Sequence, residues 1–210
     1  MGGSLNRNRW ILIAICMSVS VLFVLGIRGW MIAQRVPPQG LEEKASESLA
    51  YARKYGMSEH LCLLLDYSIP SGRPRLFVWS YEKQGIIYEA HAMHGPGNGS
   101  TKRLPSFSNE PGSECSSIGR FRVTKQHGKV NKTGYLLKGL DATNSNAYRR
   151  ALMIHSSYWV DFNRWRKYIP LNRRSCQGCV AVSHKDMAIL TKLIEGENEN
   201  LLLWGYCTEQ

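Results

Sequence analysis

Cys179 is the residue that we expect to act as a nucleophile. It follows Gly178 and leads into the short apolar run Val180–Val182. A nucleophilic thiol must be ionised, and guanidinium groups such as those of Arg173 and Arg174 are neighbours of the kind that lower a cysteine pKa. Gly178 leaves space beside the sulfur, and the backbone N–H groups of Gly178 and Cys179 are suited to stabilise the oxyanion of a substrate carbonyl. The sequence therefore predicts a cysteine active site at this turn.

His155 is the expected general base. It follows the apolar run Ala151–Ile154, a pattern that predicts a strand carrying an imidazole at its tip. A nucleophilic cysteine and its histidine meet in space rather than in sequence, so the intervening chain is compatible with a pair. We expect His155 to accept the proton of the Cys179 thiol.

The stretch Cys176-Gln177-Gly178-Cys179 also has the spacing of a redox dithiol. A thioredoxin-type motif opens a helix after a strand. Because Val180–Val182 is expected to be extended, the pattern favours a nucleophile, and thiol-disulfide chemistry through Cys176 and Cys179 is kept as a lesser alternative. His91, His94 and His155 lack the paired spacing of a zinc site. No metal and no cofactor is predicted.

The remaining cysteines leave two interpretations open. In an oxidising compartment they can form disulfides, and the sequence does not select a pairing. They can also be buried small apolar residues, since free cysteine is among the most buried residue types. Apart from Cys16 in the apolar N-terminal segment, these residues are Cys62, Cys115, Cys176 and Cys207.

Several collinear stretches resemble the YkuD-like murein L,D-transpeptidase catalytic domains, particularly the divergent branch found in Gram-negative envelopes. They are Asn146–His155 and Gly178–Val182 and, upstream, Asp66–Ser71, Arg73–Val78, His94-Gly95, Phe107–Ser113 and Ser116–Gly119. The resemblance extends over roughly residues 60 to 206. The commoner family pattern is Ser-His-Gly-Cys with arginine or asparagine two places on. Here Cys176-Gln177-Gly178-Cys179 is followed by Ala181 at that place, so a second histidine and a polar substrate contact are missing.

The resemblance implies a mainly β fold, an L,D-transpeptidase-like β-sandwich or barrel with peripheral helices. It also implies cysteine acyl transfer on peptidoglycan stem peptides. The Cys179 thiolate would attack the carbonyl on the L-centre of diaminopimelate in a tetrapeptide donor, D-alanine would leave, and a thioester would result. An amine acceptor gives a cross-link or a protein attachment, and water gives L,D-carboxypeptidase activity. The carbonyl of Ser156, where the branch usually has glycine, is expected to orient His155.

Four further residues are candidates for substrate binding, namely His94, Gly95, Arg150 and Arg174. His94 and Gly95 match a family loop that lines the cleft, although a loop histidine is also often merely solvated. Arg150 is suited to clamp a carboxylate with two hydrogen bonds or to pair with an acidic residue. Because the polar pattern around the thiol is altered, a non-catalytic envelope protein that binds murein is the alternative function.

Composition predicts one globular domain and an anionic partner. Its 210 residues are 43% hydrophobic, enough for one buried core. With 27 Lys and Arg against 16 Asp and Glu, the net charge is +11, which suits nucleic acid, a lipid surface or an acidic wall polymer equally. The family resemblance favours peptidoglycan and no nucleic-acid partner.

The N-terminal segment is expected to be a transmembrane signal anchor. The 18 residues from Trp10 to Ile27 carry no charge and would span about 27 Å as a helix, close to the thickness of the hydrocarbon core. No small-residue cleavage site precedes Arg28, although a cleaved signal peptide is the alternative. We therefore expect a cytoplasmic N-terminus over residues 1–9, a transmembrane helix over 10–33, a stem and packing helix over 34–58 and a catalytic domain over 59–210, anchored in the inner membrane and periplasmic.

The elements that position the site alternate between strands and a few helices. Helical spacing predicts a helix over residues 41–55 that ends at Gly56, and Ser183 is expected to cap a helix that ends before Gly196. A short helix is expected over 161–168. Apolar runs separated by turn residues predict strands near residues 61–69, 76–81, 86–93, 121–124, 135–140 and 201–207, and residues 94–117 form a long loop.

Overall fold

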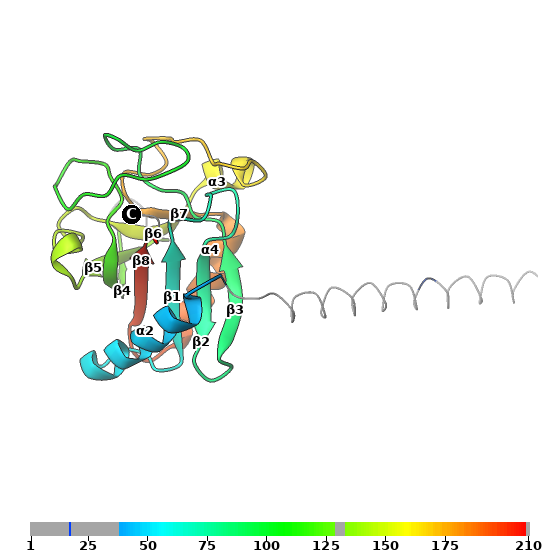
Figure 1. Ribbon diagram of the computed structural model, residues 1–210, viewed down its shortest axis with the longest axis vertical. Helices are drawn as coiled ribbons and strands as arrows, with labels where there is room; N and C mark the ends of the chain where they lie inside the picture. The colour runs from blue at the N-terminus through cyan, green and yellow to red at the C-terminus, as the bar shows by residue number, and fades with distance from the viewer. Residues whose placement is uncertain (1–16, 18–37, 129–132, 209–210) are drawn as a thin grey trace, which may run out of the picture. The chain divides into compact units, whose positions relative to one another are not determined.

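In the part of the chain that the structure describes, eight strands form one sheet in the order β3-β2-β1-β8-β4-β5-β6-β7 (Figure 1). The computed structural model describes residue 17 and residues 38–128 and 133–208. The strands are β1 Leu61–Asp66, β2 Leu76–Ser80, β3 Gly85–Ala90, β4 Gly119–His127, β5 Tyr135–Gly139, β6 Met153–Ser156, β7 Val180–Val182 and β8 Leu201–Tyr206. The first three form the predicted antiparallel meander, and the mainly β class is confirmed.

The central strand β1 is a continuous apolar run because both of its faces are buried. Leu61, Leu63 and Leu65 face the larger core, whereas Cys62 and Leu64 face a second core. Successive side chains of a strand point to opposite faces, so one strand serves both cores. The sheet is therefore covered on two sides.

Two helices cover these faces, and both carry the expected end signals. Helix α2, Leu41–Tyr55, packs on the second core and ends at Gly56, which is in the left-handed conformation that glycine favours. Helix α4, His184–Gly196, begins where the Ser183 side chain accepts a hydrogen bond from the backbone N–H of Asp186. Its inward residues in the larger core are Met187, Leu190 and Ile194.

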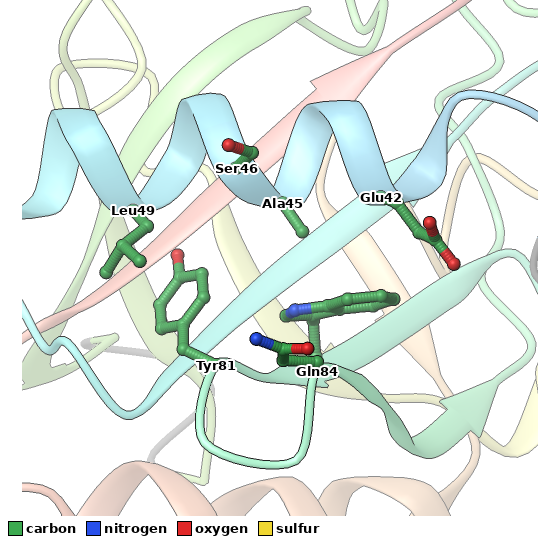
Figure 2. Close-up of a pocket in the computed structure, with 7 residues that line it drawn as sticks. Glu42, Ala45, Ser46, Leu49, Tyr81 and Gln84 are labelled. Carbon is green, nitrogen blue, oxygen red and sulfur yellow. The ribbon is translucent and has the colours of Figure 1, made fainter.

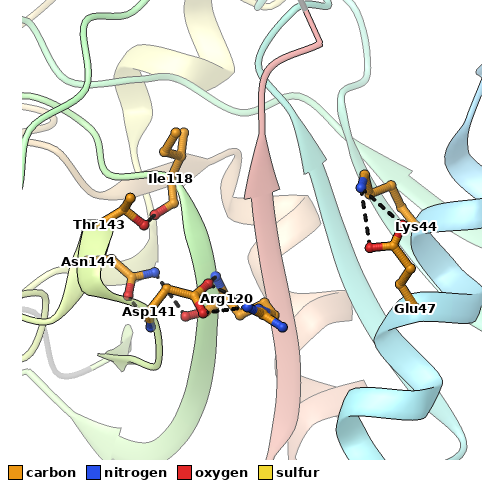
Figure 3. Close-up of polar contacts among 7 residues, drawn as sticks. All are labelled: Lys44, Glu47, Ile118, Arg120, Asp141, Thr143 and Asn144. Atoms are coloured by element: carbon orange, nitrogen blue, oxygen red, sulfur yellow. Dashed lines mark hydrogen bonds and ion pairs between the residues drawn. The ribbon is translucent and has the colours of Figure 1, made fainter.

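A polar cluster joins β4 to the turn that follows β5 (Figure 3). The carboxylate of Asp141 accepts hydrogen bonds from the backbone N and from Nη2 of Arg120, each at 2.7 Å. Asn144, at the end of the 3₁₀-helix η1 Ala142–Asn144, donates its Nδ2 to the carbonyl of Arg120 at 2.9 Å. These bonds fix the chain that leads into β6.

Strands β6 and β7, at one end of the strand order, nearly close the sheet into a barrel. Strand β7 pairs in parallel with β6, and Met93, just beyond β3, forms an antiparallel bridge with Ala181 of β7. This bridge brings together the chain just beyond β3 and strand β7, which are at opposite ends of the strand order. The barrel-like form agrees with the predicted β-sandwich or barrel.

Two helix boundaries differ from the predictions. Helix α3 spans Tyr158–Asn163 rather than residues 161–168, because the Ser157 side chain accepts from the backbone N–H of Trp159 and starts the helix early. Gly196 is the last residue of α4 rather than lying beyond its end.

The predicted transmembrane segment over residues 10–33 lies outside the described residues, apart from residue 17. Among the described residues, no helix has the length and apolar character needed to cross a bilayer. Cys62, Cys115, Cys176 and Cys179 are free thiols in the described structure.

Candidate active site

The parallel pairing of β6 with β7 brings Cys179 and His155 to the same face of the sheet. His155 is the register partner of Ala181, and Ile154 is the partner of Val180. Cys179 precedes Ala181 by two residues, so it shares a face with Ala181 and His155. Val180 and Ile154 point the other way, into the larger core. The nucleophile and base predicted from sequence are therefore brought together by strand register.

The imidazole of His155 is oriented by the backbone beside it. Its Nδ1 lies 2.9 Å from the carbonyl oxygen of Ser156, the contact that the family resemblance implied. A carbonyl accepts only, so Nδ1 carries the proton and Nε2 is left with its lone pair. Burial lowers the pKa of His155 below its ordinary value, although the Ser156 carbonyl opposes this shift. The ring is thus a neutral base.

The surroundings of Cys179 differ from the prediction. Burial raises the pKa of its thiol, and the backbone N–H groups of Met153 and Gln177 and the charge of Arg150 oppose this only in part. Arg173 does not lower this pKa, because its Nε pairs with Glu114 at 2.8 Å and its side chain is otherwise largely exposed. The expectation of an ionised thiol activated by Arg173 is wrong in this structure. The raised thiol pKa and the lowered imidazole pKa instead favour the neutral forms of both Cys179 and His155.

Gly178 occupies a position that only glycine fits. Its φ is +103°, and a Cβ would collide with the carbonyl oxygen of Cys115. Gly95 lies against the same turn, since its own Cβ would be 2.8 Å from the Gly178 nitrogen and α-carbon. The backbone N–H of Gly95 donates to Ser116 Oγ at 3.0 Å. The two glycines thus let the long loop and the nucleophile turn come into backbone contact.

Arg150 binds this loop rather than presenting a free guanidinium. Its Nη1 donates to the carbonyl of Ser108 and to Ser117 Oγ, and its Nη2 donates to the carbonyl of Cys115, each at 2.6 Å. Burial lowers the pKa of Arg150, and the nearby Cys115 and Cys179 oppose that shift. The carboxylate clamp or acidic pair expected for Arg150 is replaced by backbone carbonyls.

His94 is also a structural residue here. It is 0% exposed; its Nδ1 lies 2.9 Å from Arg75 Nη2 and its Nε2 2.8 Å from the carbonyl of Thr101. Burial and the charge of Arg75 lower its pKa to about 3. The expectation that His94 lines the substrate cleft is therefore wrong in this structure, because both ring nitrogens are used inside the protein. Sequence reasoning missed Arg75, whose buried guanidinium carries no local signal.

Cys176 lies directly beneath the nucleophile turn. Its buried Sγ donates to the carbonyl of Cys179 at 3.1 Å. Burial raises its pKa, and the backbone N–H groups of Gly178 and Cys179 oppose this by interacting with its sulfur. These are the N–H groups expected to bind an oxyanion, a role that stays a prediction. Arg174 is exposed, and its substrate-binding role also stays a prediction.

A separate cavity of about 340 Å³ lies between α2 and the turn joining β2 to β3. Figure 2 shows Tyr81 and Gln84 facing the helix that carries Ala45 and Leu49. None of the predicted catalytic residues lines this cavity. In the described residues, no cluster of three or more His, Cys, Asp or Glu side chains is placed to hold a metal ion.

One protein-family model matches most of the chain. The family model described as "L,D-transpeptidase catalytic domain" (YkuD_2) matches residues 33–204. No curated protein matches the sequence. An L,D-transpeptidase structure from Xylanimonas cellulosilytica is 15% identical over 75% of this chain and 68% of its own, with a TM-score of 0.39.

The helical cell shape determining protein Pgp2 from Campylobacter jejuni is 13% identical, with a TM-score of 0.47. That likeness covers 82% of this chain and 58% of the Pgp2 chain. The family match takes in α2, strands β1 to β7, most of β8 and both predicted catalytic residues. The chain therefore belongs to the YkuD_2 family of L,D-transpeptidase catalytic domains.

Proposed function

We propose that the protein catalyses acyl transfer on peptidoglycan stem peptides through a thioester on Cys179. The observation that supports this most directly is the alignment of Cys179, the residue before β7, with the face of the adjacent parallel strand β6 that carries His155, within a chain of the L,D-transpeptidase family. The orientation of His155 by the Ser156 carbonyl adds to it, because it directs the basic nitrogen away from the backbone.

If the Cys179 thiol and the His155 imidazole are both neutral at the start, the order of proton transfers follows. His155 Nε2 takes the thiol proton as Cys179 Sγ forms a bond to the carbonyl carbon on the L-centre of diaminopimelate. The tetrahedral intermediate collapses when the bond to the D-alanine nitrogen breaks, and His155 returns the proton to that nitrogen. An amine or water then attacks the thioester, loses its proton to His155 and releases Cys179 as a thiol.

The cellular setting follows from this substrate. Peptidoglycan lies in the cell envelope, so we place the catalytic domain there. Attachment to the inner membrane through residues 10–33, with the domain in the periplasm, remains a prediction from sequence. Protease added to spheroplasts should digest the domain, and protection of the domain would contradict export.

Mass analysis of the protein tests the chemistry. Wild-type protein mixed with a tetrapeptide donor should gain the mass of the donor minus D-alanine on the tryptic peptide that contains Cys179, and hydroxylamine should release it. Cys179→Ser keeps the position but has a far less acidic group, so it should form no adduct. His155→Ala should be similarly inactive, and combining both changes should cost little more than either alone. An adduct elsewhere, or turnover by Cys179→Ala, would contradict the mechanism.

Binding of murein without catalysis is the second candidate function. It is favoured by the raised pKa of Cys179 and by the interaction of the Gly178 and Cys179 N–H groups with Cys176. Failure to form an adduct with any donor, together with retained binding to purified muropeptides, would select this function.

A further inference from the structure

Helix α3 and the residues after it expose three large aromatic side chains together. Tyr158 is 69% exposed, Phe162 72% and Trp165 74%. Cationic side chains adjoin them along the chain, and all are exposed. We call this surface the α3 patch; it comprises Tyr158, Phe162, Arg164, Trp165, Arg166 and Lys167. Contiguous exposed apolar patches are uncommon on soluble proteins, and where they occur they often mark interaction sites.

The inner side of the same segment is fixed to the protein. Trp159 Nε1 donates to the carbonyl of Pro170 at 2.7 Å, and the backbone N–H of Ile169 donates to Ser71 Oγ at 2.8 Å. Gly72 lies so close to the backbone of Arg166 that no Cβ would fit. The aromatic side chains are therefore carried on an anchored segment, which lowers the conformational entropy lost when a ligand binds.

The patch is ordered at its outer surface as well. Trp165 Nε1 donates to the carbonyl of Phe162 at 2.7 Å, and the Arg166 guanidinium carbon lies 4.6 Å from the centre of the Trp165 ring. The Tyr158 ring lies 4.0 Å from the ring of His184. Cationic and aromatic groups are thus already arranged side by side before any partner binds.

The patch borders the catalytic pair. On the inner face of α3, Val160 is buried in one cluster with Cys176 and Ala181, and Cys179 packs against that cluster. Tyr158 follows His155 by three residues. The outer face of α3 is therefore about one helix diameter, 10–12 Å, from this cluster, which is within reach of a polymer whose stem peptide binds at Cys179.

We propose that the α3 patch binds the peptidoglycan polymer beside the reacting stem peptide, an inference that rests on the proposed function. The carbohydrate rings of the glycan present apolar C–H faces to the aromatic side chains, and the carboxylates of neighbouring stem peptides pair with Arg164, Arg166 and Lys167. The acidic residue within α3, Asp161, brings one negative charge against the three cationic side chains of the patch, so the patch keeps a net positive charge. Charge and ring chemistry together match one anionic, sugar-containing polymer.

Co-sedimentation with purified sacculi tests this inference apart from catalysis. The 210-residue chain is used in detergent and carries Cys179→Ala, so that no adduct forms and binding alone is measured. Phe162→Ser combined with Trp165→Ser should weaken binding at least about tenfold, which is the effect of losing about 1.4 kcal/mol of binding free energy. Arg164→Gln combined with Lys167→Gln should weaken binding at low salt and flatten its salt dependence. Tyr55→Ser, a change to an exposed aromatic residue of α2, should leave binding unchanged.

Three outcomes would overturn the inference. These are unchanged sedimentation of both patch variants, an equal loss with Tyr55→Ser, and shielding of Trp165 from acrylamide by phosphatidylglycerol vesicles alone. The last result would assign the patch to a membrane surface; it is measured as the difference in quenching between the reconstituted chain and its Trp165→Phe variant. Circular dichroism and thermal melting of every variant confirm that lost sedimentation is not lost folding. If the wild-type chain forms no Cys179 adduct but sedimentation still depends on the α3 patch, the proposed acyl transfer is contradicted and the proposed binding of the polymer is supported.

Discussion

Arg150 Nη2 donates a hydrogen bond of 2.6 Å to the carbonyl oxygen of Cys115, and a Cβ at Gly178 would collide with that same oxygen. One carbonyl thus joins the long loop, the guanidinium and the nucleophile turn. The geometry of Cys179 therefore depends on groups that lie far from it in sequence.

Gly178→Ala should abolish activity. Alanine at φ +103° is strained, and the collision with the Cys115 carbonyl forces the turn to move. A shift of about 1 Å at a reacting atom costs about 10²-fold in rate, so thioester formation should fall at least that far. Stopped-flow or mass measurement of adduct formation gives the rate. Gly196→Ala is the matched control, because that glycine has open space around it and should be neutral or stabilising by about 0.5–1 kcal/mol. Full activity in Gly178→Ala would contradict the described turn.

Arg150 should affect Cys179 through both its charge and its hydrogen bonds. Its positive charge lowers the Cys179 pKa, so Arg150→Gln should raise the pH at which iodoacetamide alkylates Cys179. Arg150→Lys keeps the charge and should leave that pH nearly unchanged. Both variants lose the forked contacts to the carbonyls of Ser108 and Cys115. Each carbonyl left unpaired should lower the free energy of unfolding by about 1–3 kcal/mol. Denaturant unfolding measures this loss. Equal alkylation profiles for the Gln and Lys variants would show that charge has no part.

The sequence was sufficient to predict elements whose signals are local. The apolar runs of β1, β2 and β8, the glycine end of α2 and the Ser183 cap of α4 each depend on neighbours within a few residues. The strand that carries His155 and the glycine–cysteine turn at Cys179 are also local patterns, and the parallel pairing of β6 with β7 aligns them, while their catalytic roles stay predictions.

The sequence was insufficient where partners are distant. Arg150 binds carbonyls that lie 35 and 42 residues away, and a carbonyl acceptor leaves no trace in residue type. The burial of His94 depends on Arg75, which a strand pairing places beside it. Likewise, burial of Cys179 by the whole fold raises its pKa, whereas the neighbouring sequence led us to expect that Arg173 and Arg174 would lower it.

Acyl transfer should persist below the pH at which an ordinary histidine becomes protonated. The base must be neutral, and burial lowers the His155 pKa from its ordinary value of 6.5. The acid limb of kcat/KM should therefore lie below pH 6.5. Because the pKa of Cys179 is raised, little free thiolate exists at neutral pH, and the attack must start from the thiol with His155 taking its proton. A pH–rate profile with a tetrapeptide donor measures the limb. A limb at or above pH 6.5, with the fold intact by circular dichroism, would contradict a buried neutral base.

The stability of the fold should fall in acid because of His94. Unfolded His94 takes up a proton near pH 6.5, whereas the folded pKa is about 3. Between these values the unfolded state binds more protons, so the free energy of unfolding decreases as pH falls, by up to about 5 kcal/mol at about 1.4 kcal/mol per pKa unit. His94→Gln keeps one acceptor for Arg75 and one donor for the Thr101 carbonyl but does not titrate. Its free energy of unfolding, measured by urea denaturation between pH 7 and pH 4, should change less than that of the wild type. Parallel curves would show that His94 is not the group responsible.

Cys176→Ser should keep substantial turnover. The Cys176 thiol donates to the Cys179 carbonyl at 3.1 Å in a buried position, and a serine hydroxyl has nearly the same size and can donate the same bond. Cys176→Val fills the space without a donor, so it leaves the carbonyl unpaired and should destabilise the turn by about 1–3 kcal/mol. Adduct formation by the Ser and Val variants, measured with and without reductant, separates hydrogen bonding from thiol chemistry. If Cys176→Ser were as inactive as Cys179→Ala in both conditions, the sulfur itself would be required and the dithiol alternative would replace acyl transfer.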